Sequence, residues 1–298
     1  MSTSKLFFLS FAIIISFGLN AQANLLNAKV PQEIGQYNEA QIEANDETPI
    51  PYGYVDDRDV MWSRTIWEII DLNERINFPY YYPTDTINLG TERRSLFDLL
   101  KRNIRSENLN EVYKTSYFKE KLSYSEIEEI LVAVDTTDQG YDQYNAGETI
   151  DPQFITRRNI TAAEIEQFRI KGTWYFDKRL GEMKYRIIGI APVAPDVNFL
   201  GGSKEEQDLV ELFWVWYPEA RKVLNNMKVF NSKNSSQRIS FDHMLNSRRF
   251  NATIYQEENV QEDRRIKDYL KEDALRQLLE SERIKNVIRN FELDMWNN

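Results

Sequence analysis

The chain has 298 residues, a formal net charge of −10, one histidine and no cysteine. The acidic balance argues against nucleic-acid binding, because phosphate contacts need clustered Lys and Arg. A thiol nucleophile, a disulfide and a multi-histidine metal site are excluded by residue counts alone.

Residues 1–23 are predicted to be a signal peptide. Lys5 precedes the apolar run Leu6–Leu19, and small residues follow that allow cleavage after Ala21 or Ala23. The alternative is a retained membrane anchor, but the run is short for a bilayer span. Without cysteine the chain cannot be a thioether-linked lipoprotein, so any membrane attachment has to come through a partner.

Residues 24–50 are polar, lack a sustained apolar period and end in Pro49-Ile50-Pro51. This composition predicts a flexible N-terminal arm that orders only on assembly. Residues 51–298 are predicted to form a single α+β domain.

The N-terminal half is predicted to be helical, because apolar residues recur there at the spacing of one helical face. Residues 135–153 carry Gly, Asp, Asn and Tyr without a period and are predicted to be a surface loop. The predicted helices are Asp59–Leu72 with Trp62, Ile66, Ile69 and Ile70 on one face, a segment with Leu96, Phe97, Leu100 and Ile104, and a segment that follows the capping box Ser123–Glu126.

The centre of the chain changes to a strand-like period. A second capping box, Thr161–Glu164, predicts a short helix reaching towards Phe168. Thr173–Phe176 and Met183–Val193 then form a predicted antiparallel hairpin, with its turn around residues 178–181.

The next predicted strand, Leu209–Tyr217, is apolar on both faces. Such a strand is covered on both sides, or covered once and capped by a partner. Its alternating residues are Leu212, Trp214 and Trp216 on one face and Phe213, Val215 and Tyr217 on the other. Pro218 suits the first turn of a following helix.

Phe250–Tyr255 is predicted to be a further strand, and Gln261–Phe291 a long C-terminal helix. We place Ile266, Leu270, Ala274, Leu278, Val287 and Phe291 near one face of that helix. The predicted fold class is therefore α+β, with a helical N-terminal half, a central antiparallel hairpin or sheet and a long C-terminal helix.

No residue pattern predicts catalysis, a cofactor or a metal site. His243 lies in a half-apolar helical segment, which favours a structural role over that of a general base. Asp135–Gly140 partly matches a calcium loop, but Ala146 replaces the required Glu, which leaves only a loose surface cation site open. A glycosidase-like carboxylate pair also stays open, because such pairs have no fixed spacing.

The aromatic residues are the candidate interface. Trp214, Trp216 and Tyr217 could fill a core, line a glycan platform or face a neighbouring subunit. Tyr80, Tyr81 and Tyr82 are the second choice.

Four blocks of sequence resemble the GldN (PorN) family, and together they cover the chain from about residue 50 to its end. The first reads PYGYVDDRDVMWSRTIWEIIDLNERINFPYYYP, from Pro51 to Pro83. Within it, Glu68 stands where the resemblance leads us to expect a basic residue. The others are Trp174–Asp177 with Arg186–Ile190, Leu212–Arg221, and Glu280–Lys285 with Phe291–Trp296.

The resemblance implies a non-catalytic structural subunit of the periplasmic ring of the type IX secretion system. Its implied partners are a GldK/PorK-like outer-membrane lipoprotein, a GldM/PorM-like periplasmic motor arm and further copies of itself in a ring. It would support protein secretion and gliding motility, with membrane association only through partners. The alternatives are a periplasmic glycan-binding or glycan-cleaving protein and a secreted substrate of the machinery; the charged C-terminal helix argues against the substrate.

Overall fold

The structure is a computed structural model that describes residues 48–85, 93–200, 208–229, 239–271 and 273–296. The predicted signal peptide and residues 24–47 of the predicted arm lie outside the described residues. Contacts between backbone positions group Pro49–Asn298 into one compact unit, which is described here by itself.

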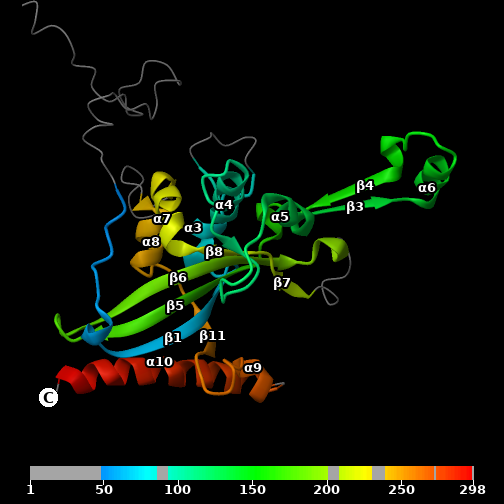
Figure 1. Cartoon of the computed structure of the whole chain (residues 1–298). Coiled ribbons are helices and arrows are strands. Elements are labelled where there is room, and N and C mark those ends of the chain that lie inside the picture. Colours follow the sequence, from blue (N-terminus) through cyan, green and yellow to red (C-terminus); the bar gives the residue numbers. More distant parts are fainter. Residues whose placement is uncertain (1–47, 86–92, 201–207, 230–238, 272, 297–298) are drawn as a thin grey trace, which may run out of the picture. The chain divides into compact units, whose positions relative to one another are not determined.

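An antiparallel sheet runs through this unit (Figure 1). Among the described residues it has seven strands in the order β11-β1-β5-β6-β8-β2, with β7 paired to β6. The strands are β1 (Val60–Asp71), β2 (Val112–Tyr113), β5 (Gln167–Asp177), β6 (Glu182–Pro195), β7 (Leu209–Glu211), β8 (Trp214–Trp216) and β11 (Thr253–Glu257). The predicted hairpin is confirmed as β5 and β6, whose register runs from Gln167 opposite Val193 to Asp177 opposite Glu182.

The prediction of a helix over Asp59–Leu72 is wrong, because most of this segment is the strand β1. It pairs with β5 along almost its whole length and with β11 near its end. Successive residues Ile66, Trp67 and Glu68 are all buried, so both faces of the strand are covered there. Covering both faces removes the period of two that marks a half-buried strand. The N-terminal half is consequently mixed rather than helical.

The helices pack against the sheet, and capping side chains explain where several of them begin. Ser95 accepts a hydrogen bond from the backbone N–H of Asp98, and Ser123 and Glu126 form the predicted capping box. Both predicted helices are therefore confirmed. The helices are α3 (Phe78–Tyr81), α4 (Leu96–Arg105), α5 (Tyr124–Leu131), α6 (Asp138–Asn145), α7 (Tyr217–Asn226), α8 (Phe241–Asn246), α9 (Ile266–Tyr269) and α10 (Ala274–Trp296).

Two further predictions between α5 and β6 are wrong. The capping box Thr161–Glu164 is present, but it closes only the single 3-10 turn Ala162–Glu164. The chain cannot continue as a helix, because β5 begins at Gln167 and pairs with both neighbouring strands. The predicted loop over 135–153 is a structured arm, which consists of β3 (Val132–Thr136), α6, the 3-10 turn Pro152–Phe154 and β4 (Ile155–Asn159).

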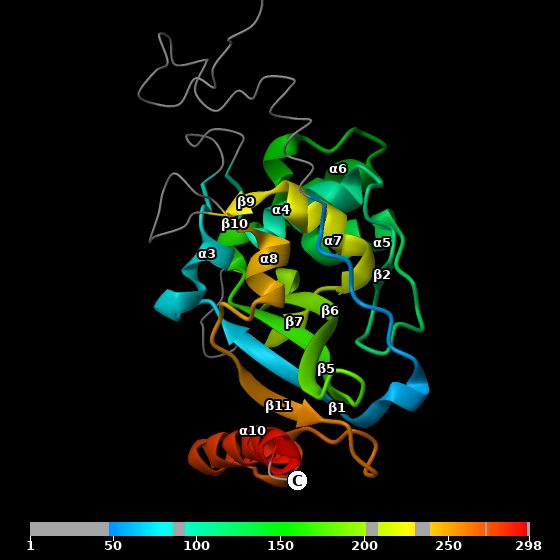
Figure 2. The same ribbon diagram turned by 90° about the vertical axis from the view of Figure 1, so that its left-hand side faces the viewer.

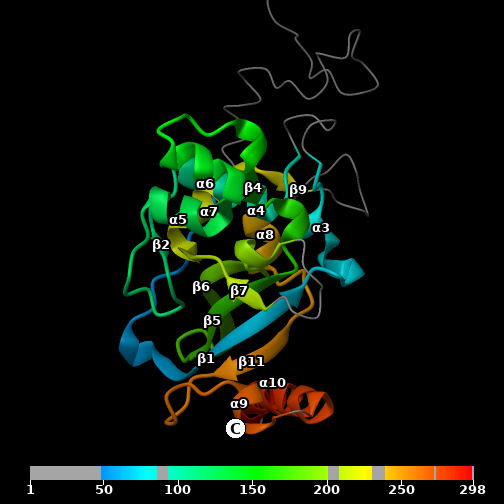
Figure 3. The ribbon, with the colours of Figure 1, turned by 90° about the vertical axis from the view of Figure 1, so that its right-hand side faces the viewer.

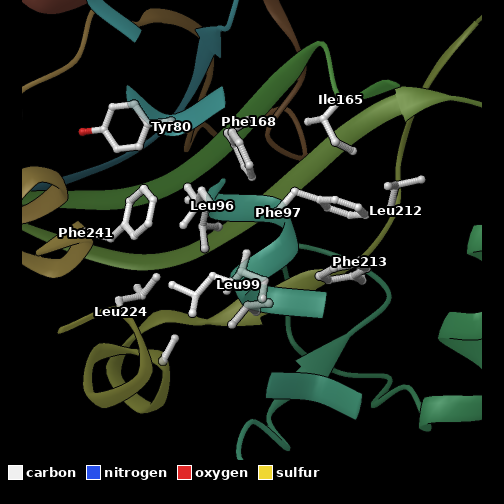
Figure 4. Packing of buried hydrophobic residues seen from close by; sticks show 14 of the residues in the cluster. Tyr80, Leu96, Phe97, Leu99, Ile165, Phe168, Leu212, Phe213, Leu224 and Phe241 are labelled. Atoms are coloured by element: carbon white, nitrogen blue, oxygen red, sulfur yellow. The ribbon is translucent and has the colours of Figure 1, made fainter. Parts of the chain in front are cut away.

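The main hydrophobic core lies between the sheet and α4, α7 and α8 (Figure 2). Figure 4 shows Tyr80 near Phe241 and Phe97 near Phe213 within this core. The strand predicted over Leu209–Tyr217 is interrupted, because Leu212 and Phe213 lie between β7 and β8, and Tyr217 already begins α7. Pro218 lies in the first turn of α7, as predicted.

The C-terminal helix α10 lies along the end of the sheet formed by β1 and β11, away from α4, α7 and α8 (Figure 2). Its Ile284 and Ile288 pack against Ile66 of β1 and Ile254 of β11. The predicted helix is interrupted between α9 and α10, which shifts the buried face away from Leu278.

Candidate interaction surface

The strand predicted as the first interface lies inside the protein. Trp214 and Tyr217 are completely buried, and Trp216 is half-buried. The indole N–H of Trp214 donates to Glu211 at 2.6 Å, and Phe118 packs edge-on against Trp216 with the ring centroids 4.9 Å apart. These rings complete the core on the single chain, so Trp214 and Tyr217 offer no surface to a neighbour.

The second predicted interface, Tyr80 to Tyr82, divides between the core and the surface. Tyr80 is completely buried, and its hydroxyl donates to the backbone oxygen of Arg249 at 3.3 Å. Tyr81 is half-buried and donates to the backbone oxygen of Ala163 at 3.1 Å. Tyr82 is 53% exposed, more than any other of the six predicted aromatic residues. Its contact with a partner stays a prediction.

Residues 50–54 form an extended segment that is bound to the rest of the unit by side-chain contacts. The Tyr52 ring packs against the guanidinium groups of Arg221 and Arg186, at 4.0 and 4.8 Å, and its hydroxyl donates to Asn246 at 2.6 Å. Three arginines donate to backbone oxygens of the segment: Arg221 to Ile50, Arg186 to Gly53 and Arg179 to Tyr54. These contacts hold residues 50–54 against the rest of the unit.

The arm made of β3, α6 and β4 was missed in the sequence, and it is the element that extends furthest from the sheet (Figure 1). Figure 3 views the protein from the side on which it lies. Among the residues that the structure describes, its two strands pair with each other and with no further strand, from Val132 opposite Asn159 to Thr136 opposite Ile155. Neither strand shows an alternation of apolar and polar residues, since β3 reads VAVDT and β4 reads ITRRN, so the sequence carries no strand signal here.

The outer end of the arm combines exposed rings with negative charge. Tyr141 is 55% exposed and Tyr144 is 68% exposed, both on α6. Residues 137–151 contain no Lys or Arg and four carboxylates, namely Asp138, Asp142, Glu148 and Asp151. An exposed, aromatic and acidic end suits contact with a basic protein surface.

A cavity of 640 Å³ lies between α4, α5 and β4. Its rim carries charges of both signs, including Asp98, Glu128 and Arg157. Burial lowers the pKa of Lys101, and its ammonium group donates to the backbone oxygen of Ile160 at 3.1 Å. Because this amine is already held by the backbone, the cavity does not present it as a base or nucleophile.

Metal and membrane features are also limited among the residues that the structure describes. They contain no group of three or more His, Asp or Glu side chains arranged to hold a metal ion. His243, which the sequence analysis assigns a structural role, lies exposed on α8. None of the described helices combines the length and the apolarity needed to cross a bilayer.

Comparison with known proteins identifies the family. A comparison with curated protein sequences found no significant match. The family described as "Gliding motility associated protein GldN" matches residues 55–297. This match covers all the elements of the sheet and α10, so the chain belongs to the GldN family of gliding motility-associated proteins.

Proposed function

We propose that this protein is a non-catalytic structural subunit of the periplasmic ring of the type IX secretion system. In this role it binds a GldK/PorK-like lipoprotein at the inner face of the outer membrane. It acts beside a GldM/PorM-like motor arm and supports both protein secretion and gliding motility. The family supplies the link to gliding motility.

The observation that carries the proposal is the projecting arm. An isolated two-stranded hairpin is marginally stable in water, so an element of this kind gains order from a partner. Along the arm, Val134 is 51% exposed and Ile155 is 37% exposed, in addition to the two exposed tyrosines of α6. Contact with another protein would bury these side chains and would contribute about 25 cal/mol per Å² of apolar surface.

The charge of the arm determines the kind of surface that it fits. The arm carries four carboxylates at its outer end. Its only basic residues, Arg157 and Arg158, lie at its base. Arg158 already forms an ion pair with Asp135 of β3. We therefore assign the outer end of the arm to a basic patch on the lipoprotein, a complementarity that chiefly raises the association rate and the specificity.

Binding of arm variants to the lipoprotein tests the proposal. The lipid-free lipoprotein of the same bacterium is titrated with the mature chain, from residue 22 onward, by calorimetry. The double variant Tyr141→Ala/Tyr144→Ala is expected to weaken binding by about 10- to 100-fold, as for paired aromatic anchors. Tyr54→Ala, which removes a ring that is 80% exposed outside the arm, is the matched control and is expected to bind normally.

A double variant that binds as tightly as the control would contradict the assignment of the arm. Absence of any binding by the unaltered chain would contradict the proposed function itself. A glycan platform built from the aromatic strand would need exposed rings, whereas Trp214 and Tyr217 are buried.

A further inference from the structure

The outer face of α10 carries leucines that the fold leaves exposed. The helix buries Ser281, Ile284 and Ile288 against β1 and β11. On the opposite side, Leu275 is 66% exposed, Leu279 is 59% exposed and Leu293 is 53% exposed. Leucines gathered on one otherwise charged helix indicate a contact surface rather than isolated exposed residues.

These leucines belong to a stripe with the spacing of a coiled-coil seam. We define the outer stripe of α10 as Leu275, Leu279, Glu282, Asn286, Arg289 and Leu293. Successive members are separated alternately by four and three residues, which averages 3.5 and keeps a seam on one side of a helix. The stripe therefore has the geometry for packing against a second helix.

On either side of Asn286 the next two members of the stripe are of the same kinds, a charged residue and then a leucine. The next member on either side is a charged residue, Glu282 before it and Arg289 after it, and beyond these lie Leu279 and Leu293. The two charges have opposite signs. Glu282 has 51% of its side chain exposed, and Arg289 is exposed and forms no ion pair with another described residue.

We propose that the outer stripe binds the same stripe of a second copy of this chain, with the two α10 helices antiparallel about a two-fold axis at Asn286. Leu279 of each copy then meets Leu293 of the other, and Glu282 of each copy meets Arg289 of the other. A two-fold interface requires such self-complementarity, because the same patch is used on both sides. A parallel arrangement would place Glu282 against Glu282, which like-charge repulsion disfavours.

The position of the charges also selects a protein partner over a lipid surface. A helix that lies in a membrane interface keeps its charged residues on the polar face and its apolar residues together. Here Glu282 and Arg289 lie in the middle of the stripe, between Leu279 and Leu293. Glu282 already pairs with Lys285 on the same helix, at 2.9 Å. Pairing across a two-fold axis gives Arg289 a counter-charge, whereas lipid chains would give it none.

The length of the stripe sets the expected affinity. Leu293 lies 18 positions after Leu275, which corresponds to about 27 Å of helix at about 1.5 Å per residue. One helix pair of this length is a small interface beside the roughly 1,200–2,000 Å² of stable complexes. The pair is therefore a reversible dimer with a dissociation constant on the order of 10 μM.

Charge reversal provides a sharp test. The mature chain alone is studied by sedimentation velocity between about 1 and 200 μM, a range that spans the expected dissociation constant. Glu282→Arg and Arg289→Glu, each alone, place like charges across the axis and are expected to weaken dimerisation at least tenfold. The double variant Glu282→Arg/Arg289→Glu restores both pairs and is expected to dimerise within about threefold of the unaltered chain.

Glu129→Arg is the matched control, because it makes the same charge change at an exposed position on α5. It is expected to leave dimerisation unchanged. The proposal is overturned if the unaltered chain stays monomeric at every concentration, or if the double variant remains as weak as the single ones. The experiment contains no lipoprotein, so its failure and the failure of the proposed function are separate results.

Discussion

Glu68 and Arg248 form a two-bonded ion pair across 180 residues of sequence. The Nη1 and Nη2 groups of Arg248 donate to the two carboxylate oxygens of Glu68 at 2.9 and 2.7 Å. Glu68 is only 1% exposed, and the Tyr185 hydroxyl also donates to it, at 2.8 Å. Burial would lower the pKa of Arg248, but the Glu68 carboxylate more than offsets this, so the pKa of Arg248 is raised.

Removing the cationic partner of this pair is expected to destabilise the protein strongly. Arg248→Met leaves the Glu68 carboxylate buried without its counter-charge, and we expect the free energy of unfolding to fall by about 3–5 kcal/mol. Urea unfolding measures the change. Arg58→Met is the control, because the side chain of Arg58 is 81% exposed and its pair with Asp56 is worth at most about 1 kcal/mol. A loss as small as that of the control would contradict the account.

Gly172 of β5 packs against the same cluster from the neighbouring strand. A Cβ atom at this position would overlap the ring and hydroxyl of Tyr185, which is held by its hydrogen bond to Glu68. Gly172→Ala is therefore expected to lower the free energy of unfolding by about 1–3 kcal/mol through overpacking. Tyr185→Phe removes the hydrogen bond that holds the ring to Glu68. The double variant Gly172→Ala/Tyr185→Phe is therefore expected to lose less unfolding free energy than the two single variants lose together. If the loss of unfolding free energy in the double variant equals the sum of the two single losses, this contact is contradicted.

Ser281 of α10 forms a hydrogen bond with the backbone of β11, the strand at the end of the sheet. Its side-chain oxygen accepts a hydrogen bond from the backbone N–H of Ile254 on β11 at 3.0 Å, and Ser281 is completely buried. Ser281→Ala leaves that N–H without a partner, and we expect a loss of about 1–3 kcal/mol in unfolding free energy. Ser125→Ala, at an exposed position on α5, is expected to change it by less than about 0.5 kcal/mol. Equal effects of the two substitutions would refute this role.

The parts of the fold predicted correctly from sequence are those decided by neighbouring residues. Capping side chains fix where α4 and α5 begin, and a turn between two apolar runs fixes the β5–β6 hairpin. Strand β1 could not be predicted in this way. Its buried Glu68 breaks the apolar pattern, and the residue that makes this burial possible, Arg248, is remote in sequence.

The candidate interface was harder to predict because burial in a core and burial against a partner favour the same side chains. Trp214 and Tyr217 have the aromatic character of interface anchors, yet Glu211 and Asp242 accept their polar hydrogens inside the single chain. The buried face of α10 was predicted incorrectly for another reason. The break between α9 and α10 changes the helical phase, so Leu278, assigned to the buried face, is 49% exposed.

Alkaline pH is expected to destabilise the protein through its buried tyrosines. Burial raises the pKa of Tyr52 to about 12 and also raises the pKa values of Tyr80 and Tyr255. Because these values exceed the value near 10 of an unfolded tyrosine, their contribution to stability is complete below about pH 10 and is lost as the pH rises through 12. Urea unfolding between pH 8 and pH 12 should show this decline, with a smaller decline in Tyr52→Phe. A constant free energy of unfolding up to pH 12 would contradict it.

The central claim is that this GldN-family chain is an assembly subunit that binds a lipoprotein. It is tested most directly by the particle mass, from light scattering, of the mature chain co-expressed with the lipid-free GldK/PorK-like lipoprotein of the same bacterium. The account predicts a stable complex of the two proteins that grows into particles many times the mass of one pair. A chain whose mass is the same with and without the lipoprotein would contradict it.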